Sequence, residues 1–156
     1  MNQGKNALFF TQAPYNPSRV WVMNHRNLLA DVDAVILQGN ETTDRLVECT
    51  VPSDQGYKYL YRTPVFEEKD HRPLVRTLMS ALELAFENDC RNFAILDEYT
   101  VEDAPILVFF AATLWVAKHK DQAMKVYLHC WNDDCKFVEY QKMKEREKEI
   151  LSKRRA

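Results

Sequence analysis

The chain has 156 residues, of which 46% are hydrophobic, and this size and composition suit one domain with a substantial core. Its 21 basic and 23 acidic residues leave a formal net charge of -2. This balance argues against a nucleic-acid-binding protein or a protein of anionic membrane surfaces, because both need an excess of Lys and Arg.

We expect a single domain over residues 1–151, followed by a short basic tail over residues 152–156 that is a solvated end. Residues 1–10 lack the order of charged, apolar and small residues that marks a secretory signal. Residues 104–117 are almost wholly apolar but too few to cross a bilayer, so we interpret them as a buried helix. The sequence predicts a cytoplasmic protein without membrane contact, in the host cytoplasm if the protein is viral.

Short runs rich in β-branched and aromatic residues occupy the first part of the chain and predict strands. They are residues 6–10, 19–24, 32–37, 46–51 and 57–66. The run at 32–37 has no polar alternation, which is typical of a strand that is covered on both faces in a parallel sheet.

Helices and strands alternate in the second part. Helical spacing of apolar residues predicts a helix over 70–88, with Pro73 in its first turn, and a charged final helix over 137–151. Between them we expect strands at 93–96 and 124–130 and an apolar helix that Asp103 starts and that ends near Lys118. The side chains expected to be buried from the two crossover helices are Leu74, Leu78, Leu82, Ile106, Phe110, Leu114 and Trp115.

This alternation predicts the fold class. Strands joined through helices form βαβ crossovers, and these give a parallel sheet with helices on both faces. We therefore expect a three-layer α/β/α fold with a mostly parallel, mixed sheet of six or seven strands, with 32–37 and 93–96 at its centre.

The strand expected at 32–37 continues into Gln38, Gly39 and Asn40, where a parallel sheet usually presents its ligand loop. A loop that holds phosphate on its backbone N–H groups needs glycine for its dihedral angles and for close approach. The chain has only three glycines. The scaffold for such a loop is present, while the residues for phosphate binding are missing.

Several segments together resemble the macro domain family. Residues 32–40, V-D-A-V-I-L-Q-G-N, are similar to the family's strand and loop "V-D-A-I-V-N-A-A-N", and residues 59–66 are similar to its strand "I-I-H-T-V-G-P-V". Residues 76–85 resemble the helix "sLelA", and residues 93–96 stand where the family has "IAFP". The resemblance covers most of the chain and implies a macro-domain-like fold that binds ADP-ribose or removes it from proteins.

The ligand loops depart from the family's pattern. Of its two loop asparagines only Asn40 remains, since Leu37 stands at the first position, and residues 41–45 replace the glycine-rich segment that follows. The second phosphate loop, "S-T-G-x-x-G-Y-P" in the family, corresponds to residues 97–103, which contain four carboxylates and no glycine. The family's acidic residue that meets adenine has no clear counterpart near Asn27.

The missing glycines and the added carboxylates both disfavour the binding of a diphosphate. Each close carboxylate would repel a diphosphate by about 1 kcal/mol even under near-aqueous screening. We therefore expect the ADP-ribose site to be disabled and no cofactor to be bound. If a pocket remains, its ligand-binding candidates are Asn40, Gly39, Gln38, Thr42 and Asn27. Asn40 has an ordinary alternative role, because Gly-Asn is a common turn pair.

Two further clusters have competing interpretations. His129, Cys130 and Cys135 lie close in sequence, but their spacing and the lack of a second ligand pair favour reduced thiols over a metal site. The carboxylates Asp97, Glu98, Glu102 and Asp103 are of the type that holds a hard cation, but solvation of a loop and capping of the next helix are favoured.

Tyr57, Tyr59 and Tyr61 alternate, which places them on one face of a strand. They suit either a stacking platform for nucleic-acid bases or a strand that faces a helix, and the negative net charge disfavours nucleic acid.

Three functional hypotheses remain from these patterns. The favoured one is a non-catalytic macro-like module that binds an unidentified protein partner or a small nucleotide-like ligand. The alternatives are an ADP-ribose binder or ADP-ribosyl hydrolase, and a module for single-stranded RNA. An enzyme is disfavoured, and the sequence indicates no oligomeric state.

Overall fold

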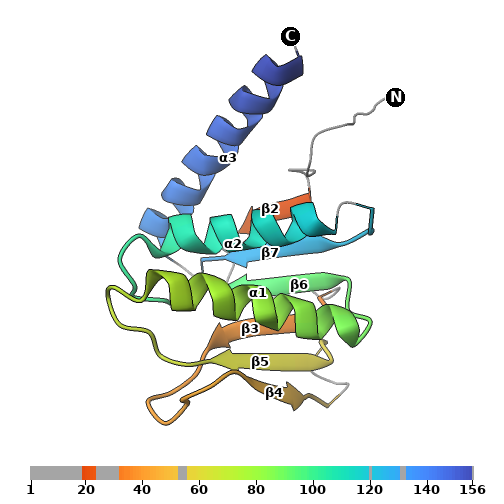
Figure 1. The fold of residues 1–156 in the computed structure, drawn as a ribbon, viewed down its shortest axis with the longest axis vertical. Helices are drawn as coiled ribbons and strands as arrows, with labels where there is room; N and C mark the ends of the chain where they lie inside the picture. The colour runs from red at the N-terminus through yellow and green to blue at the C-terminus, as the bar shows by residue number, and fades with distance from the viewer. Residues whose placement is uncertain (1–18, 24–31, 53–55, 120, 131–132, 156) are drawn as a thin grey trace.

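The computed structural model describes residues 19–23, 32–52, 56–119, 121–130 and 133–155. Within them, six strands form one sheet in the order β2-β7-β6-β3-β5-β4 (Figure 1). The strands are β2 (Val20–Met23), β3 (Ala34–Gln38), β4 (Val47–Thr50), β5 (Tyr59–Thr63), β6 (Asn92–Leu96) and β7 (Lys125–His129). The strand expected at residues 6–10 lies outside the described residues.

All neighbouring strands pair in parallel except β4, which runs antiparallel to β5 at one edge. This confirms the predicted mixed, mostly parallel sheet. The two strands without polar alternation, β3 and β6, are adjacent at its centre, as their apolar sequences predict.

Three helices complete the described part of the chain: α1 (His71–Glu87), α2 (Ala104–Lys118) and α3 (Asp134–Arg155). Helices α1 and α2 lie side by side over one face of the sheet, and α3 starts beside α2 and runs away from the body (Figure 1). The α/β class is therefore confirmed. Helix α3 begins before the predicted residue 137 and continues to Arg155, with Ser152 and Lys153 exposed.

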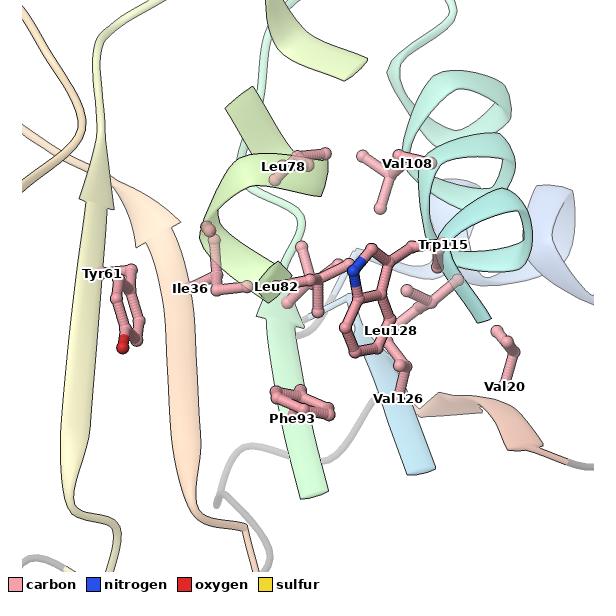
Figure 2. Close-up of a cluster of buried hydrophobic side chains, with 14 of the residues drawn as sticks. Val20, Ile36, Tyr61, Leu78, Leu82, Phe93, Val108, Trp115, Val126 and Leu128 are labelled. Carbon is pink, nitrogen blue, oxygen red and sulfur yellow. The ribbon is translucent and has the colours of Figure 1, made fainter. Parts of the chain in front are cut away.

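The main core fills the space between the sheet and the two crossover helices. Figure 2 shows Trp115 of α2 beside Leu82 of α1 and above side chains of the central strands. The ring of Trp115 meets that of Phe93 edge to face, with 5.2 Å between ring centroids. The predicted α1 face is confirmed, since Leu74, Leu78, Ala81, Leu82 and Ala85 are all buried.

Helix α2 corrects part of the burial prediction. Ile106 is 49% exposed and Phe110 is 52% exposed, and Leu114 is only partly buried. The sequence of α2 is apolar all round, so its periodicity does not identify the inner face. The small residues Ala104, Ala111 and Ala112 face the core and let the helix approach closely, while Ile106 and Phe110 point outward.

The opposite face of the sheet carries a second cluster of buried side chains. It consists of Val32, Val35, Ala94, Leu96 and Tyr127. The alternation along β3 and β6 divides the apolar residues between the two faces, as in a sheet covered on both sides. The chain between β2 and β3, residues 24–31, falls outside the described residues.

Within the described residues, no helix combines the length and the apolar character that crossing a membrane requires.

Candidate functional site

The parallel strands β3, β5, β6 and β7 have their carboxyl ends along the same edge of the sheet, across the strands, and α2 and α3 begin there. A cavity of about 540 Å³ lies at this edge. It is lined by residues 97–101, by Asp103, Ala104 and Pro105 from the start of α2, and by Asp133 and Lys136 from the start of α3. Open α/β sheets bind ligands at this end of their strands. Two loops lie there: the first loop, residues 39–43, follows β3, and the second loop, residues 97–103, follows β6 and lines the cavity.

The first loop is a compact turn built around Asn40. The Asn40 side-chain Oδ1 accepts hydrogen bonds from the Thr42 backbone N–H at 2.9 Å, from the Thr42 hydroxyl at 2.6 Å and from the Thr43 hydroxyl at 3.3 Å. The Asn40 backbone carbonyl accepts a further bond from the Thr43 N–H. Asn40 is therefore used in its own turn, which is its ordinary role in such a sequence.

Gly39 is required at this turn for a different reason. A Cβ atom at position 39 would meet the Thr43 side chain at 2.4 Å, so the two residues approach more closely than any larger residue allows. The Thr43 side chain therefore packs directly against the Gly39 backbone. Gln38 precedes Gly39, half-buried, and its enclosed side-chain oxygen has no hydrogen-bond partner among the described residues. The structure thus places Gln38, Gly39, Asn40 and Thr42 together, while Asn27 lies outside the described residues.

The second loop is built on a buried charge. Asp97, at the end of β6, is 2% exposed, and its two carboxylate oxygens have separate partners. Oδ1 accepts from the Lys136 ammonium at 2.8 Å and from the Tyr99 N–H at 3.3 Å, and Oδ2 accepts from the Tyr140 hydroxyl at 2.6 Å. The interpretation of Asp97 as a solvated loop residue is wrong, because α3 covers it and supplies its counter-ion.

Lys136 is fully engaged in the same network. Besides the Asp97 carboxylate, its ammonium donates to the Asp97 carbonyl at 3.2 Å and to the Tyr99 carbonyl at 2.7 Å. An ammonium has three N–H donors, so all of them are used within the protein. The cation that lines this cavity is therefore directed inward and has no free donor for a phosphate.

Tyr99 and Tyr140 close the network from two sides. The Tyr99 hydroxyl pairs with the Thr63 hydroxyl at the end of β5, at 2.7 Å. Burial raises the pKa of Tyr99 and Tyr140 above the ordinary value, and the nearby Asp97 raises the pKa of both further. Burial also raises the pKa of the Cys130 thiol to about 12, and Asp97 adds to the effect while Lys136 opposes it. These groups stay neutral at physiological pH, which leaves Asp97 and Lys136 as the paired charges.

The remaining charges around the cavity are carboxylates. Glu98 and Asp103 are exposed, and Asp133 accepts a hydrogen bond from the Lys136 N–H, three residues on, in the pattern of an N-cap. Asp103 stands at the N-cap position of α2, as predicted, but its backbone is left-handed, with φ 61°, and its side chain makes no capping bond. The prediction that Asp103 caps α2 through its side chain is therefore wrong.

The thiol and tyrosine clusters have structural roles. All four cysteines are free, and Cys130 is buried just after β7, while Cys135 is exposed in α3. Among the described residues, no three His, Cys, Asp or Glu side chains are arranged to hold a metal ion.

The predicted tyrosine face does not form as a stacking platform. Tyr59 and Tyr61 pack in the core under α1, whereas Tyr57 precedes β5 and packs with the cluster on the opposite face. The Tyr61 hydroxyl donates to Glu48 at 2.7 Å and accepts from Asn88 at 3.0 Å. Of the two alternatives for these residues, the structure supports the strand that faces a helix.

The chain was compared with family models, curated protein sequences and solved structures. No family model and no curated protein sequence matches the chain. Solved structures do match, and those named below are macrodomains. The Trypanosoma brucei macrodomain superposes with a TM-score of 0.64 at 13% identity, covering 83% of this chain and 69% of that one. A mutant of the Oceanobacillus iheyensis macrodomain also gives 0.64, at 9% identity, covering 85% and 92%.

The chain has a macrodomain fold. The T. brucei macrodomain in complex with ADP-ribose superposes with a TM-score of 0.61 at 14% identity, covering 83% of this chain and 72% of that one. At this low identity the likeness establishes the fold, which confirms the resemblance seen in the sequence.

Sequence reasoning missed the residues that organise the second loop of this macrodomain fold. Lys136, Tyr99, Thr63 and Tyr140 were not among the candidate site residues. One signal was available. An aspartate directly after a buried strand costs folding free energy unless its carboxylate is paired, so a cation from elsewhere in the chain was required. The sequence offers 21 basic residues, and only the folded chain shows which one is used.

Proposed function

We propose that this chain is a non-catalytic binding module on a macrodomain scaffold. In place of ADP-ribose, it binds a protein or a nucleoside-derived ligand that has no diphosphate. The observation that carries the proposal is the state of Lys136, the cation of the carboxyl-end cavity, whose three donors are all used by Asp97 and Tyr99. A diphosphate there would meet the exposed carboxylates of Glu98 and Asp103 without a free counter-charge.

The first loop supports the same proposal. A ligand diphosphate is held by successive backbone N–H groups that point into a concave loop. Here the Thr42 and Thr43 N–H groups bond to Asn40, and Thr43 packs against Gly39. Binding a phosphate would require this turn to open, so each of the two loops disfavours the ligand independently.

An ADP-ribose binder remains the alternative function, because the T. brucei macrodomain of the same fold was solved in complex with ADP-ribose. The two functions differ in a direct measurement. Isothermal titration and thermal unfolding should be run with ADP-ribose, ADP and adenosine, beside a hydrolysis assay on ADP-ribosylated protein. A ligand at about 1 mM with a Kd above about 1 mM stabilises the fold by less than about 0.4 kcal/mol, which is the upper limit we expect for ADP-ribose.

A charge-neutral variant sharpens the test. Glu98→Gln/Asp103→Asn removes two exposed carboxylates without touching the Asp97–Lys136 pair, so it should strengthen ADP binding relative to adenosine if charge excludes the diphosphate. Micromolar binding of ADP-ribose to the wild-type chain that Asn40→Ala abolishes, or release of ADP-ribose from modified protein, would show that the proposal is wrong.

A further inference from the structure

A shallow groove runs between α1 and α2 on the side that faces away from the sheet. Its volume is about 370 Å³, and it shares no lining residue with the carboxyl-end cavity. The two helices lie side by side along it, and Figure 1 shows that no other described element crosses this side. The groove therefore offers a surface of its own, whatever binds at the strand ends.

The floor of the groove is apolar. Val75 and Met79 of α1 and Leu107 of α2 are partly buried against the core, and Phe110 stands beside them with 52% of its surface exposed. Ile106, one turn before Phe110 on α2, is 49% exposed. Two large apolar side chains that project from neighbouring turns next to a groove are typical of an interaction site.

The rim of the groove is basic in a chain whose net charge is negative. Arg72 and Arg76 are exposed one helical turn apart on α1, and neither forms an ion pair with any described residue. Asp70 and Asp103 stand at the N-cap positions of α1 and α2, so the arginines, and not the helix dipoles, supply the positive charge of the rim. Glu102 lies 3.8 Å from the ring of His71, a residue of the groove, and neither residue is paired with Arg72 or Arg76.

We propose that this groove docks an acidic amphipathic helix of a partner protein. A groove between two parallel helices accepts a third helix by the packing of ridges into grooves, with large apolar side chains over Val75, Met79 and Leu107. Arg72 and Arg76 are spaced to meet carboxylates one turn apart on that helix, and the planar guanidinium suits a two-point contact with each. Phe110 lines the same groove and supplies the aromatic anchor.

The probe is a fluorescein-labelled synthetic helix of about 18 residues, with Leu and Trp at helical spacing on one face and Glu on the flanks. Fluorescence anisotropy with the full chain should show saturable binding that weakens as salt is added. Arg72→Glu/Arg76→Glu should weaken binding by about tenfold or more, since it replaces attraction by repulsion at two positions, and Phe110→Ala should weaken it independently.

A matched control is available on α3. Lys142→Glu/Arg146→Glu makes the same change of charge at the same spacing on another exposed helix face and should leave the affinity within about twofold. Circular dichroism would show that each variant is folded. Equal binding of a peptide with Lys in place of Glu, or of a scrambled acidic peptide, would overturn the proposal. So would a dimer of the chain that Arg72→Glu/Arg76→Glu dissociates, because the groove would then hold a second copy.

Discussion

The loops that follow β3 and β6 lie at the same edge of the sheet and differ in how their polar groups are satisfied. In the first loop, Asn40 bonds to Thr42 and Thr43, two and three residues away, and the turn is exposed. In the second loop, Asp97 bonds to Lys136 and Tyr140, 39 and 43 residues away, and the carboxylate is buried. One loop is stabilised locally and the other by tertiary structure.

This difference has an energetic consequence. A local turn in water can exchange its hydrogen bonds for bonds to solvent, so losing one of them costs little. A buried carboxylate has no such exchange, and its stability depends on the docking of α3. Both loops use their polar groups within the protein, but only the second ties the site to the rest of the fold.

The largest expected effect comes from breaking the buried pair on one side. Asp97→Ala leaves the Lys136 ammonium, 17% exposed, without its carboxylate, and should lower the free energy of unfolding by about 3–5 kcal/mol. Urea denaturation would measure the loss. In the double variant Asp97→Ala/Lys136→Met the cost should be clearly smaller than the sum of the single costs. Additive costs would show that the two groups do not act as a pair.

The next largest effect should come from alkaline pH, which lowers the folding stability through two buried thiols, one in the core and one beside the second loop. Burial raises the pKa of Cys90 from 9.0 to about 11 and that of Cys130 from 9.0 to about 12. The folded state therefore holds protons that the unfolded state loses. The resulting stability is complete below pH 9 and falls as pH rises toward 11–12, by about 1.4 kcal/mol per pH unit for each thiol.

Urea midpoints between pH 8 and pH 10 would measure this slope; buried tyrosines extend the decline at higher pH. Cys90→Ala/Cys130→Ala provides the control, because removal of both thiols should flatten the dependence between pH 9 and pH 10. An unchanged slope in that variant would assign the loss of stability to other groups.

The smallest effect should follow from changing the first loop. Asn40→Ala removes the acceptor of an exposed turn and should cost about 0.5–1 kcal/mol, several times less than Asp97→Ala. Thermal and urea unfolding would give the value, and Asn40→Asp, which keeps an oxygen acceptor, should retain most of the stability. A cost of Asn40→Ala equal to that of Asp97→Ala would contradict the contrast between the two loops.

Much of the scaffold could be predicted from the sequence because its signals are local. Unbroken apolar runs identified β3 and β6, the helical spacing of Leu74, Leu78 and Leu82 identified the inner face of α1, and the segments around Asn40 carried the resemblance to macro domains. The same reasoning failed for Ile106 and Phe110, since a helix that is apolar all round carries no periodic signal for its inner face.

The sequence by itself determined the α/β class, the central strands and the absence of glycine from the second loop, because each depends on residues that are neighbours in the chain. Only the tertiary structure decided that Lys136 neutralises Asp97, that Tyr99 meets Thr63, and that Arg72 and Arg76 flank an apolar groove. Those contacts join residues of different elements, and a partner is selected by the packing of helices on the sheet, which no spacing along the chain encodes.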